Sequence, residues 1–233
     1  MFGELIYYNK KKIEQYMALI EGKATKLKQE NTFESNNRQL DYLLECGRFE
    51  LLLKGRDDYY DFVDDNFGIN IKDVKIGSII RVRGEIFVPE EFDMVPIIDK
   101  YKPLLLSSVE CKDAEERQLL NLVFHGSKMK VPIFCELGSD CDYWLGIGKV
   151  SPDDLLVDYN DLEDYEGKEV TIIAKLEARK FCKDIPLKVF DIYKDFLGLN
   201  RAFRKEMKTG SGQEFESIEV KEDYLALELL AIY

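Results

Sequence analysis

Two clusters of carboxylates are the residues of this chain with the clearest potential for chemistry. The first consists of Asp57, Asp58, Asp61, Asp64 and Asp65. The second consists of Asp158, Asp161, Glu163, Asp164 and Glu166. Hard cations such as Mg²⁺ and Ca²⁺ take carboxylate oxygens as ligands. The candidate ligand or metal residues are therefore Asp58, Asp61, Asp158 and Asp161.

A solvated acidic loop is the alternative interpretation of both clusters. Neither cluster has the Ca²⁺-loop pattern of alternating Asp, then Gly, then a distant Glu. Asp58-Tyr59 and Asp158-Tyr159 resemble each other, which favours a shared structural role such as a cap or a bond with a tyrosine hydroxyl. General acid–base catalysis would also require an apolar pocket that raises the pKa of one carboxyl group.

The other motifs give little support for catalysis. His125 is the only histidine, with Ser127 nearby, but no G-x-S-x-G motif accompanies them. A histidine in the last turn of a helix interacts favourably with the helix dipole, so we expect a structural role. Gly146-Ile147-Gly148-Lys149 lacks the remainder of a phosphate-binding loop. We therefore expect no catalytic residue and no cofactor, which favours a protein that is not an enzyme.

A small basic group near the C-terminal end offers a different kind of contact. Arg201 and Arg204 stand close to Lys205 and Lys208. Arg201 and Arg204 are candidates for binding an anion or an acidic partner, because guanidinium groups pair well with carboxylates and phosphates. The alternative is that they are ordinary charges at a helix end.

The overall charge restricts the partners. The 233 residues include 45 acidic and 33 basic ones, which gives a net charge of −12. Proteins that hold nucleic acid use Lys and Arg, so nucleic acid is an unfavoured partner, and an anionic membrane surface is too. The five cysteines form no C-x-x-C pair. With no signal peptide and no apolar run near ~20 residues, we expect a cytoplasmic protein without membrane contact.

Two similar segments dominate the expected architecture. In Gly77–Val88 and in Gly167–Ala178 apolar residues alternate with polar ones, the pattern of half-buried strands. We interpret them as copies in a diverged internal duplication, although two alternating strands can also resemble each other by chance. The predicted fold is α+β, with two β-rich modules and helices on one face. Residues 1–107 form a strand–helix segment and the first module, and residues 108–233 form the second.

Local patterns predict the remaining elements. Residues 4–8 read as a strand, Asn9 as the N-cap of a helix, and Gly22 as its end. A second helix is expected from Ser35 or Asn36 to Gly47, with Leu40, Leu43 and Leu44 as its apolar face. A strand is expected over residues 49–54.

The second half contains further expected elements. Residues 130–137 and 143–150 read as a hairpin, and residues 216–233 as one long strand or two. A helix is expected after Asp184, with Pro186 in its first turn and Leu187 on its apolar face.

The N-terminal residues resemble a known family. Leu5-Ile6-Tyr7-Tyr8-Asn9, followed by Ile13, Tyr16, Met17, Ile20 and Gly22, is similar to the opening of a family of uncharacterised bacterial proteins with a domain of unknown function. Residues 199–204 and 231–233 are also similar to it. The family usually has Asp at the position of Asn9. The resemblance implies a bacterial source, and it assigns no activity and no catalytic residue.

Three functions are consistent with these residues. The first is a non-catalytic protein–protein interaction or regulatory module, since a duplicated module would offer two similar surfaces. The second is a nucleotide or small-molecule sensor, or a metal-dependent hydrolase, with the four aspartates in a cleft between modules. The third is an acidic nucleic-acid mimic or a nucleic-acid binder of the OB type. The sequence favours the first and leaves the oligomeric state open.

Overall fold

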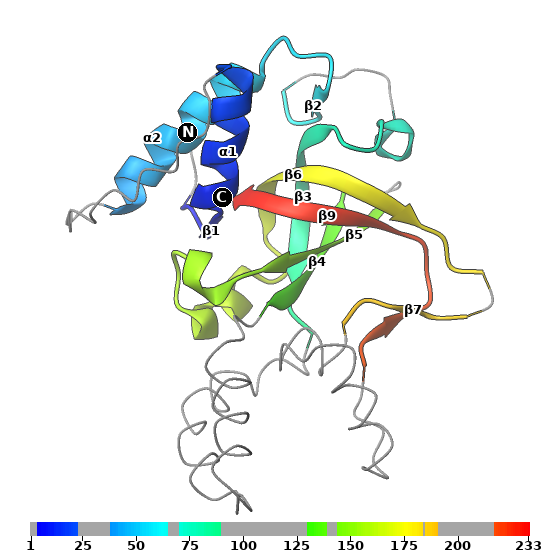
Figure 1. Cartoon of the computed structure of the whole chain (residues 1–233). Coiled ribbons are helices and arrows are strands. Elements are labelled where there is room, and N and C mark those ends of the chain that lie inside the picture. The colour runs from blue at the N-terminus through cyan, green and yellow to red at the C-terminus, as the bar shows by residue number, and fades with distance from the viewer. Residues whose placement is uncertain are drawn as a thin grey trace, which may run out of the picture.

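The centre of the molecule is a closed five-stranded barrel (Figure 1). The computed structural model describes residues 4–22, 38–64, 70–89, 130–138, 144–183, 185–190 and 217–233. The barrel strands are β3 (Ile79–Phe87), β4 (Val131–Leu137), β5 (Trp144–Val150), β6 (Glu169–Lys180) and β9 (Tyr224–Ile232). All neighbouring strands are antiparallel except β5 and β9, which are parallel. This ring, in the order β3-β4-β5-β9-β6, has the Greek-key connectivity of OB-type barrels.

Alternate residues of each strand fill the barrel interior, as the period-2 pattern predicts. Those of β3 and β6 include Ile80, Val82, Ile86, Val170, Ile172, Ala174 and Leu176, all of them buried. Two interior positions of β5 are glycines, because a side chain would not fit there. A Cβ atom on Gly148 would lie 2.4 Å from Cγ of Leu229. The glycines that superficially resemble a phosphate loop are thus part of barrel packing.

The two similar segments lie side by side in this one barrel. β3 and β6 are antiparallel neighbours, with Val82 opposite Ile172. Each follows a glycine in the left-handed region, Gly77 with φ 95° and Gly167 with φ 66°. The strand predictions are confirmed, and the combination of helices with a mainly β core agrees with the broad fold class. Two modules and a duplication are not seen in the described residues, and the boundary expected at 107–108 lies outside them.

The first elements follow the expected order. β1 (Tyr7–Tyr8) pairs with the end of β9, and α1 (Lys10–Ile20) comes next. Oδ1 of Asn9 accepts a hydrogen bond of 3.1 Å from the Lys12 N–H, so Asn9 is the N-cap. Gly22 follows the helix with φ 66°. The N-cap and the terminating glycine are confirmed.

The second helix is longer than predicted and has a different buried face. α2 (Arg38–Leu53) continues through Gly47 and ends before Gly55, which has φ 83°. The strand expected over residues 49–54 is therefore wrong. Cys46, Phe49 and Leu53 recur at helical spacing and are buried, and their packing outweighs the ~1 kcal/mol that an interior glycine costs a helix. The expected apolar face is wrong at Leu40 and Leu44, which are exposed, whereas Leu43 packs against the buried residues as predicted.

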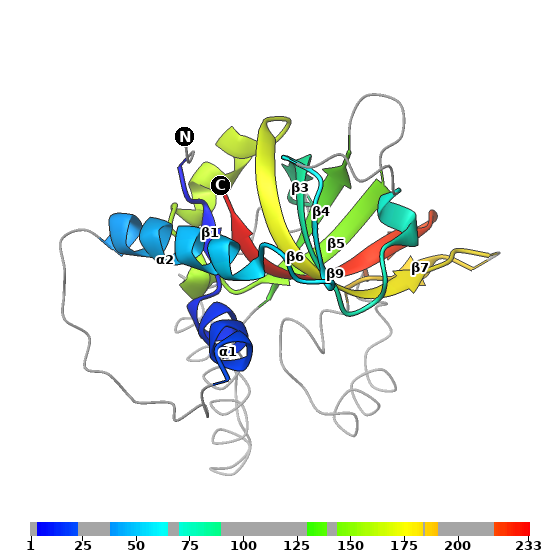
Figure 2. The same cartoon turned by 90° about the horizontal axis from the view of Figure 1, so that it is seen from above.

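Both helices lie on the outside of the barrel. Seen from above, α1 and α2 lie beside the end of β9, close to both chain ends (Figure 2). A second apolar cluster joins them to the barrel, and it includes Leu5, Tyr8, Ile13, Phe49, Ile173 and Leu230. The short strand β2 (Tyr59–Asp61) follows α2 and runs parallel to the first residues of β3. α2 and β2 thereby meet at one end of β3.

Three 3₁₀ helices complete the connections between the described strands. They are η1 (Ile71–Asp73), η3 (Pro152–Asp154) and η4 (Tyr159–Tyr165). η3 and η4 link β5 to β6, and Leu162 of η4 packs into the core of the barrel.

A small two-stranded sheet covers part of the outer barrel surface. β7 (Leu187–Lys188) pairs with β8 (Glu219–Val220), so the helix expected after Asp184 is wrong at Leu187. Val189 and Val220 pack on Ile147 of β5, which explains why this segment is extended. Residues 216–233 were expected to form one long strand or two, and the separation of β8 from β9 shows that they form two. Among the described helices, none has both the length and the apolar character needed to span a membrane.

Candidate functional site

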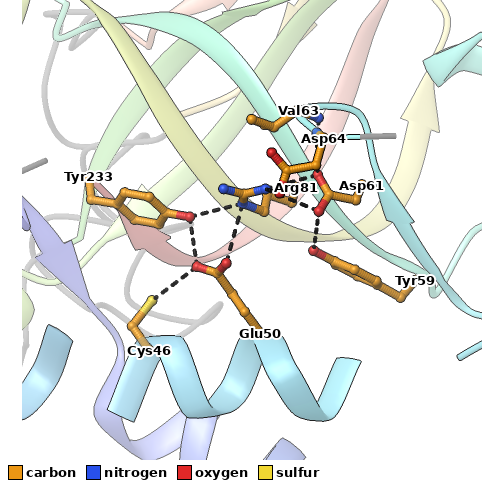
Figure 3. A network of polar contacts seen from close by, with 8 residues as sticks. All are labelled: Cys46, Glu50, Tyr59, Asp61, Val63, Asp64, Arg81 and Tyr233. Carbon is orange, nitrogen blue, oxygen red and sulfur yellow. Dashed lines mark hydrogen bonds and ion pairs between the residues drawn. The ribbon is translucent and has the colours of Figure 1, made fainter. Parts of the chain in front are cut away.

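Among the described residues, an extensive and largely buried polar network surrounds Arg81 (Figure 3). Arg81 points outward from β3, yet α2 and β2 cover it, and its side chain is only 11% exposed. Three carboxylates surround the guanidinium group. Glu50 comes from α2, Asp61 from β2 and Asp64 from the turn after β2. Elements far apart in the sequence therefore place one cation among three anions.

Asp61 is the most completely bonded of these carboxylates. Its side chain is 3% exposed and accepts hydrogen bonds from Nη1 of Arg81, both at 3.1 Å. It also accepts from the Tyr59 hydroxyl at 3.3 Å, and from the N–H groups of Val63 and Asp64 at 3.0 and 3.2 Å. Both oxygens are thus used by protein donors. Asp61 holds the β2 turn and Arg81 together.

Tyr233 connects Arg81 to α2. Nε of Arg81 donates to the Tyr233 hydroxyl at 3.0 Å, and that hydroxyl donates to Glu50 at 2.7 Å. Nε also lies 3.5 Å from the second oxygen of Glu50, whose side chain is 10% exposed. The Cys46 thiol lies 4.0 Å from Glu50, one helical turn earlier. This chain of bonds fixes α2 on the barrel.

The network keeps its groups in fixed protonation states. Burial alone lowers the pKa of Arg81, but Tyr233, Glu50 and Asp61 raise it, so that the net pKa lies above the ordinary value. The pKa of Tyr233 is raised by burial and by its bond to Glu50. The pKa of Tyr59 is raised by burial and by the charge of Asp61. The guanidinium group therefore stays charged and both phenols stay neutral at physiological pH.

An open groove of about 1090 Å³ borders this network. It runs between α2 and the ends of β3 and β6. Its apolar lining comprises Leu40, Leu43, Leu44, Leu51, Val63 and Val170. Leu40, Leu44 and Leu51 lie along one helical face and are 50%, 66% and 70% exposed. A stripe of large apolar side chains facing solvent is a feature of interaction surfaces.

Charged side chains line the same groove. Arg48, Lys54, Arg81 and Arg83 are its cations, and Glu50, Asp64 and Glu169 are its anions. Arg83 and Glu169 form an exposed ion pair at 3.5 Å, and such pairs contribute about 0–1 kcal/mol. For Nη2 of Arg81 the described residues contain no hydrogen-bond acceptor. The groove thus combines an apolar surface with a buried cation that has donor capacity left.

The structure separates the four candidate aspartates. Asp58 precedes β2 and forms an exposed ion pair with Arg56 at 2.7 Å, which lowers the pKa of Asp58. Asp158 and Asp161 belong to the start of η4, where the Asp161 N–H donates to the Asp158 carbonyl oxygen. η4 is followed by Glu166, which accepts from the Val88 N–H beyond the far end of β3.

The aspartate pairs therefore lie toward opposite ends of β3, and within the described part of the chain no three acidic, Cys or His side chains form a metal-binding group. Arg201, Arg204 and His125 lie outside the described residues. A ligand role for any of these residues stays a prediction.

Sequence reasoning missed Arg81, Glu50 and the leucine stripe. The alternation of β3 could have shown that Arg81 points away from the barrel interior, but nothing local indicates that α2 covers it. Glu50 lies between Phe49 and Leu53, so a helical reading across Gly47 would have placed it on the buried face. The same helical interpretation would have predicted that Leu40, Leu44 and Leu51 face solvent.

The chain has no counterpart among the proteins with which it was compared. No protein-family model, no curated protein and no solved structure matches it. The N-terminal resemblance to an uncharacterised bacterial family consequently stays a prediction.

Proposed function

We propose that this protein is a non-catalytic interaction module that binds a partner protein in the groove along α2. The observation that carries this proposal is the row of Leu40, Leu44 and Leu51, which are 50–70% exposed beside a groove of about 1090 Å³. Burying such side chains contributes roughly 1.5–3 kcal/mol each. A partner would therefore gain considerable free energy from covering them.

The shape and charge of the groove favour an amphipathic helix as the bound segment. Three leucines along the exposed face of α2 offer an apolar surface for the helix-in-groove mode, in which apolar anchors of the bound helix recur every three or four residues. A carboxylate on the partner would complete the hydrogen bonds of Arg81 Nη2 and pair with Lys54. We propose a partner helix with apolar residues on one face and an Asp or Glu beside them.

The network beneath the groove supports binding rather than catalysis. Asp61 and Glu50 are engaged by Arg81 and by tyrosine hydroxyl groups, so they act as structural anchors for α2. A rigid helix loses little conformational entropy when a partner binds. The buried ions thereby hold the leucine row in place.

Crosslinking tests this proposal directly. A photo-reactive amino acid at Leu44 or Leu51 should crosslink one stoichiometric partner in the native cell, whereas one at Ile185 should not. Ile185 is an exposed apolar residue that precedes β7, and β7 lies on the other side of the barrel from α2 (Figure 1). With the purified partner, Leu44→Glu should weaken binding by at least about tenfold, as loss of an interface anchor does.

Ile185→Glu is the matched control and should bind as the wild type does. Equal crosslinking at all three positions would contradict the proposal. So would a Leu44→Glu variant that is folded and binds the partner normally.

OB-type nucleic-acid binding is a second candidate function, and the strand order of the barrel favours it. Against it, residues of the paired strands β7 and β8 cover part of the outer surface of β5 and β9 with apolar contacts. Retention on single-stranded DNA that decreases with salt would support this second candidate.

A further inference from the structure

A second cavity lies between the barrel and the segment that contains β7. Its volume is about 580 Å³, within the usual range of small-molecule pockets. Its lining shares no residue with the groove along α2. Ile147, Val189 and Leu227 contribute buried apolar surface to it. The cavity is therefore a separate pocket with an apolar floor.

Four lysines from four separate parts of the chain converge on this pocket. They are Lys130 before β4, Lys149 on β5, Lys180 at the end of β6 and Lys188 on β7. The side chains of Lys130, Lys180 and Lys188 form no ion pair or hydrogen bond with any described residue. Like charges that converge in this way repel one another unless an anion lies between them.

The two acidic residues of the pocket compensate this charge only in part. Glu228 lies 2.5 Å from Nζ of Lys12 and accepts a hydrogen bond of 2.5 Å from the Tyr16 hydroxyl. Its charge is thus already engaged by α1. Glu177 is exposed. In a chain with a net charge of −12, this pocket is a local concentration of positive charge.

We infer that the pocket binds a small molecule that carries two or more phosphate groups. Lysine ammonium groups bind phosphate as point charges, and four lysines from separate parts of the chain supply enough positive charge for more than one phosphate group. The apolar floor can accept a ring or another apolar part of the same molecule. Phe190 and Tyr224 line the pocket but are buried, so they offer no exposed ring for stacked bases. These features fit a nucleotide better than a nucleic-acid strand.

Titration calorimetry of the full chain at low salt tests this inference, with pyrophosphate and ATP as probes and without added metal. Both should bind saturably and more weakly as salt is raised, because salt screens exposed charges. The double variant Lys180→Gln/Lys188→Gln should bind at least about tenfold more weakly. Both lysines are exposed, so the variant should keep the fold, which circular dichroism checks.

Lys75→Gln is the control, because Lys75 is exposed and lies outside both cavities. It should leave binding unchanged. The inference is overturned if neither probe binds, or if the double variant binds as well as Lys75→Gln does. It is also overturned if a 12-nucleotide oligothymidylate binds more tightly than ATP, since the lysines would then belong to a binding site for single-stranded nucleic acid. None of these outcomes bears on the groove along α2.

Discussion

Arg81 shows how one residue connects the barrel to its surroundings. Its guanidinium group binds Asp61 and Asp64 on one side and Glu50 and Tyr233 on the other. The cost of burying these charges is offset only while every member keeps its partner. A tyrosine hydroxyl bond was suggested for Asp58 and Asp158, but the described bond of this kind joins Tyr59 to Asp61, and Asp58 pairs with Arg56. Arg81 itself could not be predicted as the partner of Asp61, because the pairing depends on how α2 packs.

Removal of this cation should greatly lower the stability of the protein. We predict that Arg81→Met lowers the free energy of unfolding by about 3–5 kcal/mol, because Glu50 and Asp61 would remain buried without their cation. Urea denaturation measures this loss. Arg83→Met is the control, since Arg83 is on the same strand but is exposed, and among the described residues it pairs only with Glu169.

The free energy of unfolding of the Arg83→Met control should fall by no more than about 1 kcal/mol. Equal losses in the two variants would show that the buried network contributes no more than a surface ion pair.

Among the elements, the strands were predictable and α2 was not. The alternation of apolar and polar residues along most of β3 and β6 indicates a buried face, and a period of two has no helical equivalent. In α2, Gly47 resembles a helix end, and the apolar residues on both sides of it fit either a strand or a helix. Only packing of Phe49 and Leu53 on the barrel decides between them. The β7 segment was mistaken for the same reason, since its contacts with Ile147 are not local.

The narrow interior beside β5 leads to a prediction for Gly148. Gly148→Ala should destabilise the protein by about 1–3 kcal/mol, because the new methyl group would overlap Leu229. Leu229→Ala alone should cost about 2–5 kcal/mol by leaving a cavity. The double variant should lose less stability than the sum of the two single losses. Thermal unfolding of the wild type and the three variants measures this coupling between Gly148 and Leu229. Additive losses would contradict the overlap.

At the scale of the whole molecule, the alternation of residues could not show which strands are neighbours. Two similar strands suggested two modules, but β3 and β6 are adjacent in one barrel. Similar amphipathic patterns arise wherever strands share an interior, so resemblance alone does not demonstrate duplication. The candidate site is likewise a product of tertiary structure, since it combines α2, β2, β3 and Tyr233.

The shared barrel predicts that the two halves of the chain depend on each other. Fragments 1–107 and 108–233 should each fail to fold alone, because β3 forms hydrogen bonds with both β4 and β6. Circular dichroism and hydrogen exchange of each purified fragment measure this. Mixing the two should restore protection from exchange. A fragment that unfolds cooperatively on its own would instead support two independent modules.

β9 contacts β1, β5 and β6, and it is the last strand of the barrel to be added along the sequence. Until it docks, β5 and β6 each present an open edge that another polypeptide can use. Two chains that refold together at high concentration can therefore exchange these strands and become entwined. Dilution during refolding should suppress such intertwined dimers. The yield of monomer therefore measures how fast β9 docks within its own chain.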